Sequence, residues 1–318
     1  MTSPTNNIVI DLIVPVFNES DRMVPHIKDM LNTVYSAGFT PHIIMVDDGS
    51  TDNTWGVIKE LNVQFPEIEG VRLSRNFGKD NAIFTGLKYS HGMAAITIDS
   101  DGQHPISMIP EMLTRWSNGT LIVHAVKAKR SGEGHWVKLR AKIFNSIISK
   151  LMGTKLEGVS DYKLLDKKVV EILRLCATIN SVYRFFVVDF GFPSSTVPMN
   201  TLPSPRPSRW NLRSLFQLSI RAIMFHTDVP IKAFVLLILL TIGLAVTLVG
   251  ILVFSLIFGT VSEGYSTILV LSLLNLCITT LGITGVSVYL KTTLDIVAGR
   301  TGATEWERTF IKPRYENE

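Results

Sequence analysis

The stretch HIIMVDDGSTDNT, residues 42–54, contains the repeating unit from which the fold can be predicted. Its apolar, β-rich run His42–Val46 ends in the polar loop Asp47–Thr51, and the helical stretch Thr54–Phe65 follows. The same order of strand, polar loop and helix recurs through the first part of the chain. Apolar runs cover residues 8–14, 42–46, 71–73, 94–98 and 121–125, and helical stretches cover 25–37, 54–65, 79–90 and 106–116. This alternation predicts an α/β domain with a Rossmann-like, mostly parallel sheet and helices on both faces.

Polar loops follow four of these strands, at the point where each strand ends. They read PVFNE (15–19), DDGST (47–51), RNFGK (75–79) and DSDGQ (99–103). Open α/β sheets bind ligands at the carboxyl ends of their strands, so we expect one active site built from these loops. Neither G-x-G-x-x-G nor G-x-x-x-x-G-K-[ST] follows the first strand, which is evidence against a dinucleotide dehydrogenase or a P-loop enzyme.

Asp99 and Asp101 flank Ser100 at the end of an apolar run. Mg²⁺ in proteins takes one or two carboxylates together with substrate phosphates. A lone D-x-D is common in solvated turns, but this one accompanies three other polar loops. We therefore predict a divalent cation site here.

The functions of two other polar pairs stay open at this point. Asp47 and Asp48 either form a turn that caps the helix from Thr54 or recognise a uracil or guanine base and its ribose. Arg75 and Lys79 are either solvated charges around a glycine or contacts to a phosphate.

Length and composition limit the number of domains and the classes of partner that the chain can have. The chain has 318 residues, enough for one sizeable globular domain and a smaller part. The formal net charge is +4, with basic residues gathered in Lys127–Lys155 and Arg206–Arg221, which indicates an anionic surface or substrate rather than nucleic acid. Cys176 and Cys277 form no disulfide framework or zinc-ligand spacing. Residues 1–7 are polar and do not resemble a signal peptide, so we expect the first domain to stay in the cytoplasm.

Two uncharged apolar runs, Phe234–Phe258 and Tyr265–Leu290, are each long enough to cross a bilayer. The connection Gly259–Gly264 carries Glu263 and no basic residue. Basic residues lie outside the two runs, at Lys232 before the first and at Lys291, Arg300, Arg308, Lys312 and Arg314 after the second. The positive-inside rule then predicts a transmembrane hairpin with both termini in the cytoplasm.

The chain is therefore expected to have four parts. Residues 1–200 form the cytoplasmic α/β domain, and 201–232 form a juxtamembrane linker with an amphipathic interfacial helix at 211–224. Residues 233–291 hold the two transmembrane helices, and 292–318 form a cytoplasmic tail.

Five sequence runs in order resemble the motifs of family 2 glycosyltransferases, which have a GT-A fold. These are PVFNES (15–20), VDDGSTDNT (46–54), LSRNFGKDNAIFTGL (73–87), IDSDGQHP (98–105) and SDYKLLDKKVV (160–170). Within that family the chain resembles the polyprenyl-phosphate sugar transferases, a group that includes bactoprenol glucosyltransferases and dolichol-phosphate mannose synthase. The two apolar runs fit the bactoprenol branch.

The resemblance implies roles for individual residues. It places Asp161 near the reacting sugar as a catalytic residue with Asp101, although Ser160 and Asp161 could otherwise form a turn or cap. The metal, Mg²⁺ or Mn²⁺, would be held by Asp99, Asp101 and Gln103. The nucleotide sugar would contact Pro15, Phe17, Glu19, Val46, Asp48, Lys79 and Ser100. The acceptor phosphate would meet Lys127, Arg130, Arg140, Arg206 and Arg209.

Two departures from the family pattern concern the acceptor site. Family members usually have Arg at the position of Lys127, and PRPSRW (205–210) replaces the usual G-x-S-K-Y before the membrane. The lysine ammonium carries its charge on one nitrogen and cannot form the bidentate hydrogen bonds of an arginine guanidinium. Which of these cations binds the acceptor phosphate therefore stays open.

The predicted activity is transfer of a hexose, most simply glucose from UDP-glucose, to undecaprenyl phosphate with inversion. The predicted site of action is the cytoplasmic face of a bacterial inner membrane. Mannose transfer from GDP-mannose and a non-catalytic nucleotide-sugar-binding scaffold are the alternatives. A processive polysaccharide synthase is disfavoured, because Q-x-x-R-W and additional spans are missing from the sequence. A homo-oligomer, such as a tetramer, is also expected from the resemblance.

Overall fold

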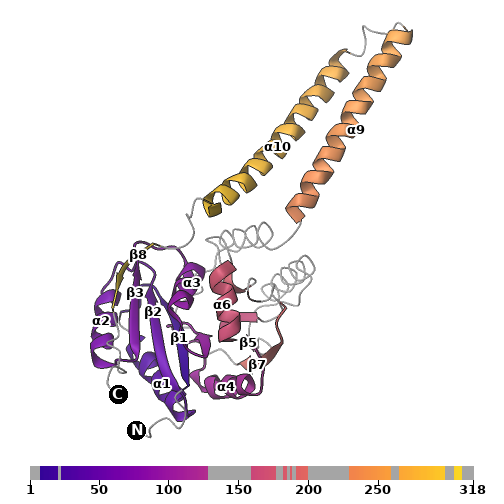
Figure 1. Cartoon of the computed structure of the whole chain (residues 1–318). Helices are drawn as coiled ribbons and strands as arrows, with labels where there is room; N and C mark the ends of the chain where they lie inside the picture. Colours follow the sequence, from indigo (N-terminus) through magenta and orange to yellow (C-terminus); the bar gives the residue numbers. More distant parts are fainter. Residues whose placement is uncertain are drawn as a thin grey trace, which may run out of the picture. The chain divides into compact units, whose positions relative to one another are not determined.

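The computed structural model describes residues 8–20, 23–127, 159–176, 182–184, 187, 191–199, 229–258, 265–297 and 304–309. It divides the chain into two compact units, Met1–Ala222 with Gly302–Glu318, and Ile223–Thr301. The first unit is an α/β domain and the second is a pair of long helices (Figure 1).

The strands of the α/β unit are β1 (Val9–Val16), β2 (Thr40–Asp47), β3 (Ile68–Leu73), β4 (Ala94–Thr97), β5 (Ile122–Lys127), β6 (Val159–Asp166), β7 (Ser194–Met199) and β8 (Glu305–Arg308). Its helices are α1 (Met23–Ser36), α2 (Thr54–Gln64), α3 (Lys79–Tyr89), the 3₁₀ turn η1 (Ile106–Met108), α4 (Ile109–Ser117) and α6 (Lys167–Cys176). The strands and helices expected from the repeating unit are all present, with boundaries shifted by a few residues.

Within the described residues, these strands form one eight-stranded mixed sheet in the order β7-β5-β6-β4-β1-β2-β3-β8. Strands β4, β1, β2 and β3 run parallel to one another, whereas β6 and β8 are antiparallel to their neighbours β4 and β3. The register aligns Val16 with Asp47 and Asp47 with Arg72. The loops after the parallel strands therefore meet at one edge of the sheet, as the sequence predicted.

Helices cover both faces of the sheet because its central strands are apolar on both sides. On β1, Leu12 and Val14 belong to the cluster that includes residues of α1, α2 and α4, and Ile13 belongs to the cluster that includes residues of α3 and α6. All three side chains are fully buried, since successive residues of a strand point to opposite faces. Burial of each such side chain contributes about 1.5–3 kcal/mol.

Two elements of the sheet differ from the sequence expectations. Ser160 and Asp161 lie within strand β6, between β4 and β5, and not in a turn or helix cap. The segment 292–318, expected to be a tail, continues α10 to Val297 and then contributes the edge strand β8, which pairs with β3. The segment after the second apolar helix is therefore part of the α/β unit.

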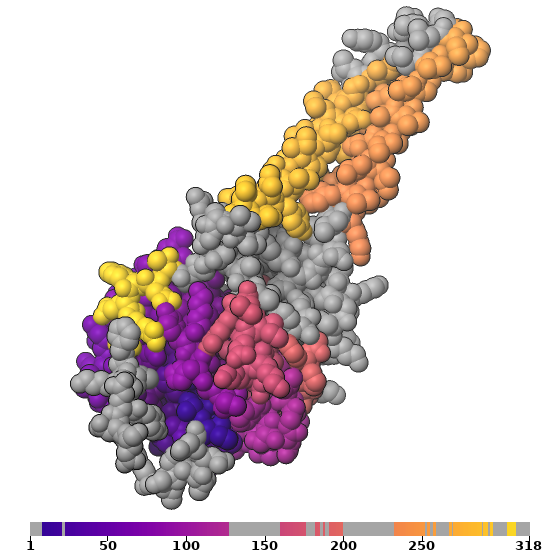
Figure 2. All heavy atoms as spheres, in the orientation of Figure 1, coloured from indigo at the N-terminus to yellow at the C-terminus, as the bar shows by residue number. Residues whose placement is uncertain are grey.

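The described part of the second unit comprises α9 (Val229–Phe258) and α10 (Tyr265–Val297). Their most apolar windows, Lys232–Ile251 and Val270–Lys291, have mean hydropathies of 2.8 and 1.7, and none of the side chains that the structure describes there is buried. Figure 2 shows these helices in orange and yellow as a pair with exposed side chains. At about 1.5 Å per residue, each helix exceeds the roughly 30 Å of a bilayer core, so both are candidates to span a membrane.

The two helices pack against each other as an antiparallel pair. Phe234, near the start of α9, makes an edge-on ring contact with Tyr289, near the end of α10, at a centroid distance of 6.0 Å. Asn275 Nδ2 lies 3.5 Å from the carbonyl oxygen of Thr241. Thr279 and Thr280, by contrast, donate their hydroxyls to carbonyls of α10 itself. Of the polar residues in the middle of the second helix, only Asn275 therefore has a hydrogen bond that reaches the neighbouring helix in the described part of the chain.

Candidate active site

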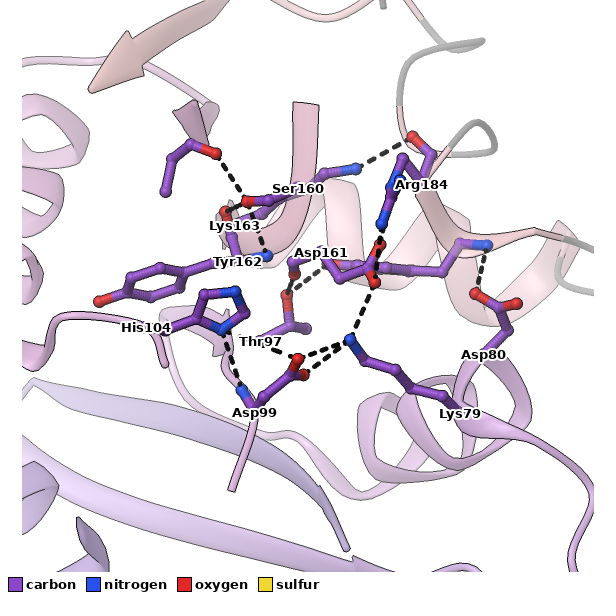
Figure 3. A network of polar contacts seen from close by, with 12 residues as sticks. Lys79, Asp80, Thr97, Asp99, His104, Ser160, Asp161, Tyr162, Lys163 and Arg184 are labelled. Carbon is purple, nitrogen blue, oxygen red and sulfur yellow. Dashed lines mark hydrogen bonds and ion pairs between the residues drawn. The ribbon is translucent and has the colours of Figure 1, made fainter. Parts of the chain in front are cut away.

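Asp161 is held by two cations at the carboxyl edge of the sheet (Figure 3). Arg184 donates from Nε to Oδ1 at 3.1 Å and from Nη2 to Oδ2 at 3.2 Å, and Lys79 Nζ donates to Oδ2 at 2.9 Å. Burial alone would raise the pKa of Asp161, but Arg184 and Lys79 hold that pKa well below its usual range. Asp161 is therefore an ionised carboxylate at any pH near neutrality.

Lys79, the first residue of α3, also contacts Asp99 with its ammonium group, at 2.8 Å. Burial opposes the charge of Lys79, yet Asp161 and Asp99 together raise its pKa above the ordinary value. Lys79 is thus not a solvated charge beside Gly78. It connects the D-x-D loop after β4 with strand β6.

The topology explains why Asp99 and Asp161 lie close together. Strands β4 and β6 are antiparallel, and Thr97 pairs with Lys163. Asp99, two residues after Thr97 at the end of β4, therefore comes opposite Asp161, two residues before Lys163 in β6. The Thr97 hydroxyl also donates to the carbonyl oxygen of Asp161 at 2.5 Å, which fixes this alignment.

A buried layer supports the ion pairs from behind. Lys163 is fully buried, its Nζ donates to the carbonyl oxygen of Arg184 at 3.0 Å, and burial lowers its pKa to about 7. The Tyr183 N–H donates to Asp80 Oδ1 at 3.1 Å. These contacts hold the backbone around Arg184 so that its guanidinium faces Asp161.

His104 is a further polar group beside Asp99. Its ring stacks on Tyr162 at a centroid distance of 5.2 Å, and its Nδ1 lies 3.9 Å from Asp99 Oδ2. Burial lowers the pKa of His104 despite the nearby carboxylates, so the ring is neutral at pH 7. A neutral imidazole beside a carboxylate is suited to assist a metal or a phosphate oxygen.

The predicted metal residues form a tight turn after β4. The Gln103 N–H donates to Asp101 Oδ1 at 3.0 Å, Asp101 is exposed, and Ser100 is buried. Gly102 has φ +73°, and a Cβ there would lie 2.2 Å from the His26 ring, so only glycine fits this turn. Carboxylate oxygens of Asp99 and Asp101 at one loop suit a hard divalent cation, with Lys79 as the competing cation at Asp99.

Asp47 and Asp48 hold the loops together and do not cap α2. Asp48 accepts the N–H groups of Phe77 at 2.7 Å and Gly78 at 3.0 Å, and Asp47 Oδ1 accepts the Ser50 N–H at 2.9 Å. The α2 N-terminus is instead served by Asp52, which accepts the Thr54 N–H at 3.0 Å. Burial raises the pKa of Asp48 to about 6 even though the two amides stabilise its charge.

A cavity of about 430 Å³ lies beside these loops. It is lined by the loops after β1, β2 and β3, by the end of β3 and by β8, namely Phe17, Gly49, Ser50, Thr51, Arg72, Leu73, Ser74, Arg75, Asn76 and Trp306. Gly49 has φ +66°, and a Cβ there would lie 2.3 Å from the backbone of Arg75, so this glycine lets the second and third loops approach each other. The cavity has the volume typical of small-molecule sites.

Comparison with known proteins identifies the family to which this arrangement belongs. The sequence model of the family described as glycosyl transferase family 2 matches residues 11–189, more than half of the chain. The chain belongs to glycosyl transferase family 2. An uncharacterized glycosyltransferase of Synechocystis sp. is 30% identical over 228 residues, which are 71% of each chain.

Two further comparisons extend this result. A bactoprenol glucosyl transferase of Shigella phage SfX is 29% identical over 269 residues, covering 82% of this chain and 87% of the relative. The crystal structure of mannosyl-3-phosphoglycerate synthase from Rubrobacter xylanophilus superimposes with a TM-score of 0.52 at 18% identity, covering 68% of this chain and 73% of that one. The α/β unit of this family 2 glycosyltransferase thus has the GT-A fold, and the protein is an enzyme of the glycosyltransferase class.

Within the glycosyltransferase, the residues expected to contact the nucleotide lie in different surroundings. Phe17 lines the cavity, and Pro15 is half-buried at the end of β1, where it pairs with Val46. Val46 itself is fully buried in the core that includes residues of α3, so its side chain is not exposed to a ligand. The Glu19 N–H donates to Thr54 Oγ1 at 3.0 Å, which fixes the loop after β1 to α2.

The expected acceptor cations fall largely outside the described residues. Arg130, Arg140, Arg206 and Arg209 lie in ranges that the structure does not describe. Lys127 is the last residue of β5, and its side chain is likewise not described. Arg184, which sequence reasoning missed because it belongs to no recognisable motif, is the described arginine that contacts Asp161.

A second polar network lies at the opposite end of the strands. Asp11 Oδ1 is 2.6 Å from His42 Nδ1, His42 Nε2 is 3.6 Å from Glu69 Oε2, and Glu69 pairs with Arg308 of β8. Asp11, His42 and His91 could together hold a metal by position alone. Asp11 Oδ2, however, already accepts the Ser90 hydroxyl and the Gly92 N–H, both at 2.6 Å. The network joins β1, β2, β3 and β8, and it is distinct from the predicted metal site at Asp99 and Asp101.

Proposed function

We propose that this enzyme transfers a hexose, most simply glucose from UDP-glucose, to a polyprenyl phosphate such as undecaprenyl phosphate. One combination of features carries the proposal: the Asp99–Lys79–Asp161–Arg184 cluster and two long apolar helices occur in one chain. A lipid acceptor requires an enzyme that stays at the membrane, and a sugar diphosphate donor requires a site with carboxylates and cations.

The extent of the match to the bactoprenol glucosyl transferase supports the lipid acceptor. That match covers 82% of this chain, whereas α9 begins at Val229. The alignment is too long to end before α9, so the similarity includes part of the helical pair. Similarity in the helices as well as in the α/β unit favours an acceptor of the same chemical type.

The charges around Asp161 suggest its part in the reaction. A polyprenyl phosphate is already anionic near neutral pH, because its second pKa is about 6, so its oxygen can attack the anomeric carbon without a strong base. Asp161, whose pKa is held far below neutrality, is a poor proton acceptor and a good orienting group. We infer that Asp161 keeps Lys79 and Arg184 in place, and that these cations offset the repulsion between the donor and acceptor phosphates.

Asp99, Asp101 and Gln103 are the proposed holders of Mg²⁺ or Mn²⁺, assisted by His104. The ion would stabilise the departing nucleoside diphosphate. Pro15, Phe17, Glu19, Val46, Asp48, Lys79 and Ser100 remain the proposed nucleotide-sugar residues, with Val46 acting through its backbone. Attack in line with the departing diphosphate inverts the anomeric centre.

The return of the chain to the sheet constrains the membrane topology. The chain up to Ala222, before α9, and strand β8, after α10, belong to the same compact unit. If α9 and α10 span the bilayer, both ends of the pair must therefore lie on one side. The distribution of Lys and Arg favours the cytoplasmic side, where Lys127, Arg130, Arg140, Arg206 and Arg209 are proposed to meet the acceptor phosphate.

The proposal is tested by incubating the purified full-length enzyme with undecaprenyl phosphate, Mg²⁺ or Mn²⁺, and a panel of UDP- and GDP-sugars. We expect a lipid-linked glucose with β configuration, identified by mass spectrometry and NMR. If the enzyme transfers mannose from GDP-mannose and not glucose, the donor is assigned as GDP-mannose. Tight donor binding with no lipid product from any donor would favour the scaffold alternative.

A further inference from the structure

Strand β8 pairs with β3 through a bulge at one residue. Arg72 is opposite Glu307, but the next residue, Leu73, is opposite Glu305, so Trp306 is the extra residue. The neighbouring side chains confirm the change of face: Glu305 contacts Tyr89 of α3, whereas Glu307 accepts a hydrogen bond from Trp55 of α2 at 2.8 Å. β-Bulges often redirect a side chain next to a functional site.

The redirected side chain of Trp306 lies against Arg72. The Arg72 guanidinium is 5.1 Å from the centroid of Trp306 and 6.0 Å from that of Trp55. Arg72 is itself fixed, because Nη2 donates to the Ser50 carbonyl at 3.2 Å and Nε lies 3.3 Å from Asp47 Oδ2. A cation held in this way orients the indole through its π face.

Trp306 nevertheless remains 69% exposed and lines the cavity of about 430 Å³ that Phe17 also lines. In Figure 2 the yellow atoms of β8 lie at the surface of the α/β unit. An oriented but exposed indole costs free energy unless a ligand covers it, and a flat aromatic ligand gains most from such a surface. Arg75 and Asn76, on the same cavity, offer polar groups to the edge of such a ligand.

We propose that Trp306, supplied by the strand after the helical pair, stacks on the nucleobase of the donor. The inference rests on the proposed function, in which the donor is a nucleoside-diphosphate sugar. The described donor pocket is then incomplete without β8. The segment beyond the apolar helices acts as part of the substrate site and not as a tail.

The test measures binding of UDP, and separately of pyrophosphate, to full-length enzyme in neutral detergent with Mn²⁺. In the Trp306→Ala variant we expect UDP affinity to fall about tenfold, in the range of one lost base–aromatic stacking contact, with pyrophosphate affinity unchanged. Trp306→Phe should keep most of the affinity, because it keeps an aromatic ring. UDP should also quench tryptophan fluorescence in the wild type and in Trp116→Phe, but much less in Trp306→Phe.

The control residue Trp116 lies in α4, where its Nε1 donates to Asp166 at 2.8 Å, away from the cavity. If Trp306→Ala binds UDP as tightly as the wild type, the stacking role is wrong while the proposed function stands. An equal loss of UDP and pyrophosphate affinity would also overturn the inference, because it would indicate general disruption of the site. If the wild type binds no nucleotide, the proposed function fails as well.

Discussion

Lys79 Nζ lies 2.9 Å from Asp161 Oδ2, and this contact joins residues that are 82 positions apart in the chain. The same ammonium group is 2.8 Å from Asp99. One side chain at the start of α3 therefore connects the D-x-D loop to strand β6.

Replacing Lys79 with methionine removes the bridging charge and keeps most of the apolar stem. We expect kcat to fall at least a hundredfold, because two carboxylates then face each other without the shared cation. The loss of stability should be only about 1 kcal/mol, since Lys79 is 39% exposed and Arg184 still pairs with Asp161. Lys88→Met, an exposed change in the last turn of the same helix, is the control. Near-wild-type turnover of Lys79→Met would contradict a role in transfer.

Asp101→Ala should abolish transfer and weaken binding of Mn²⁺ while leaving the fold intact. The carboxylate is exposed and accepts the Gln103 N–H, so the expected change in unfolding free energy is within about 0.5 kcal/mol. Circular dichroism, metal titration and product assays check the three parts. Glu60→Ala, at an exposed position of α2, should change none of them. If the wild-type enzyme keeps its full turnover in excess chelator, Asp101 is not part of a metal site that transfer requires.

The buried carboxyl of Asp48 should make stability depend on pH. Burial raises its pKa to about 6, above the ordinary 3.8, so the folded state binds this proton more tightly than the unfolded state. The resulting stabilisation is complete below pH 3.8 and is lost as the pH rises through about 6. Relative to Asp48→Asn, the wild type should lose about 2 kcal/mol of unfolding free energy between roughly pH 4.5 and 7.5. Unfolding free energies are measured by denaturation at both pH values. If they change by the same amount between the two pH values in the wild type and in Asp48→Asn, the raised pKa is excluded.

Arg308→Ala should loosen β8 from the sheet. It leaves the buried Glu69 carboxylate without its arginine, which we expect to cost about 2 kcal/mol and to speed hydrogen exchange at 304–309. The exposed Arg115–Glu111 pair on α4, at 2.8 Å, is the matched control, and Arg115→Ala should cost less than about 1 kcal/mol. Equal costs for the two variants would show that the Arg308 pair does not hold the strand.

The cations ahead of the first apolar helix should act on the lipid acceptor. Arg206→Ala and Arg209→Ala should raise the KM for polyprenyl phosphate, or lower turnover, without weakening donor binding. The assay is run in neutral detergent, where general attraction to anionic lipids, worth about 1 kcal/mol per residue, is absent. If both variants match the wild type there, Lys127, Arg130 and Arg140 become the better candidates.

Much of the α/β unit could be predicted because its information is local. Apolar runs such as 42–46 form strands wherever both faces can be buried, and polar loops such as 99–103 must then lie at the exposed carboxyl edge. Strand β6 was harder to predict from the sequence, since Ser160 and Asp161 are as compatible with a turn as with a strand. Its position depends on pairing with β4 and β5, which are distant in the sequence.

The sequence by itself determined the family, the parallel core of the sheet, the D-x-D loop and the two apolar helices, because each depends on residue type and spacing along the chain. Tertiary structure alone decided that Lys79 bridges Asp99 and Asp161, that Arg184 completes this cluster, and that Trp306 reaches the cavity beside Phe17. These relationships depend on which strands become neighbours and on a one-residue bulge in β8. Strand neighbours are set by the free energy of burying the whole sheet, and no local pattern of residues records them.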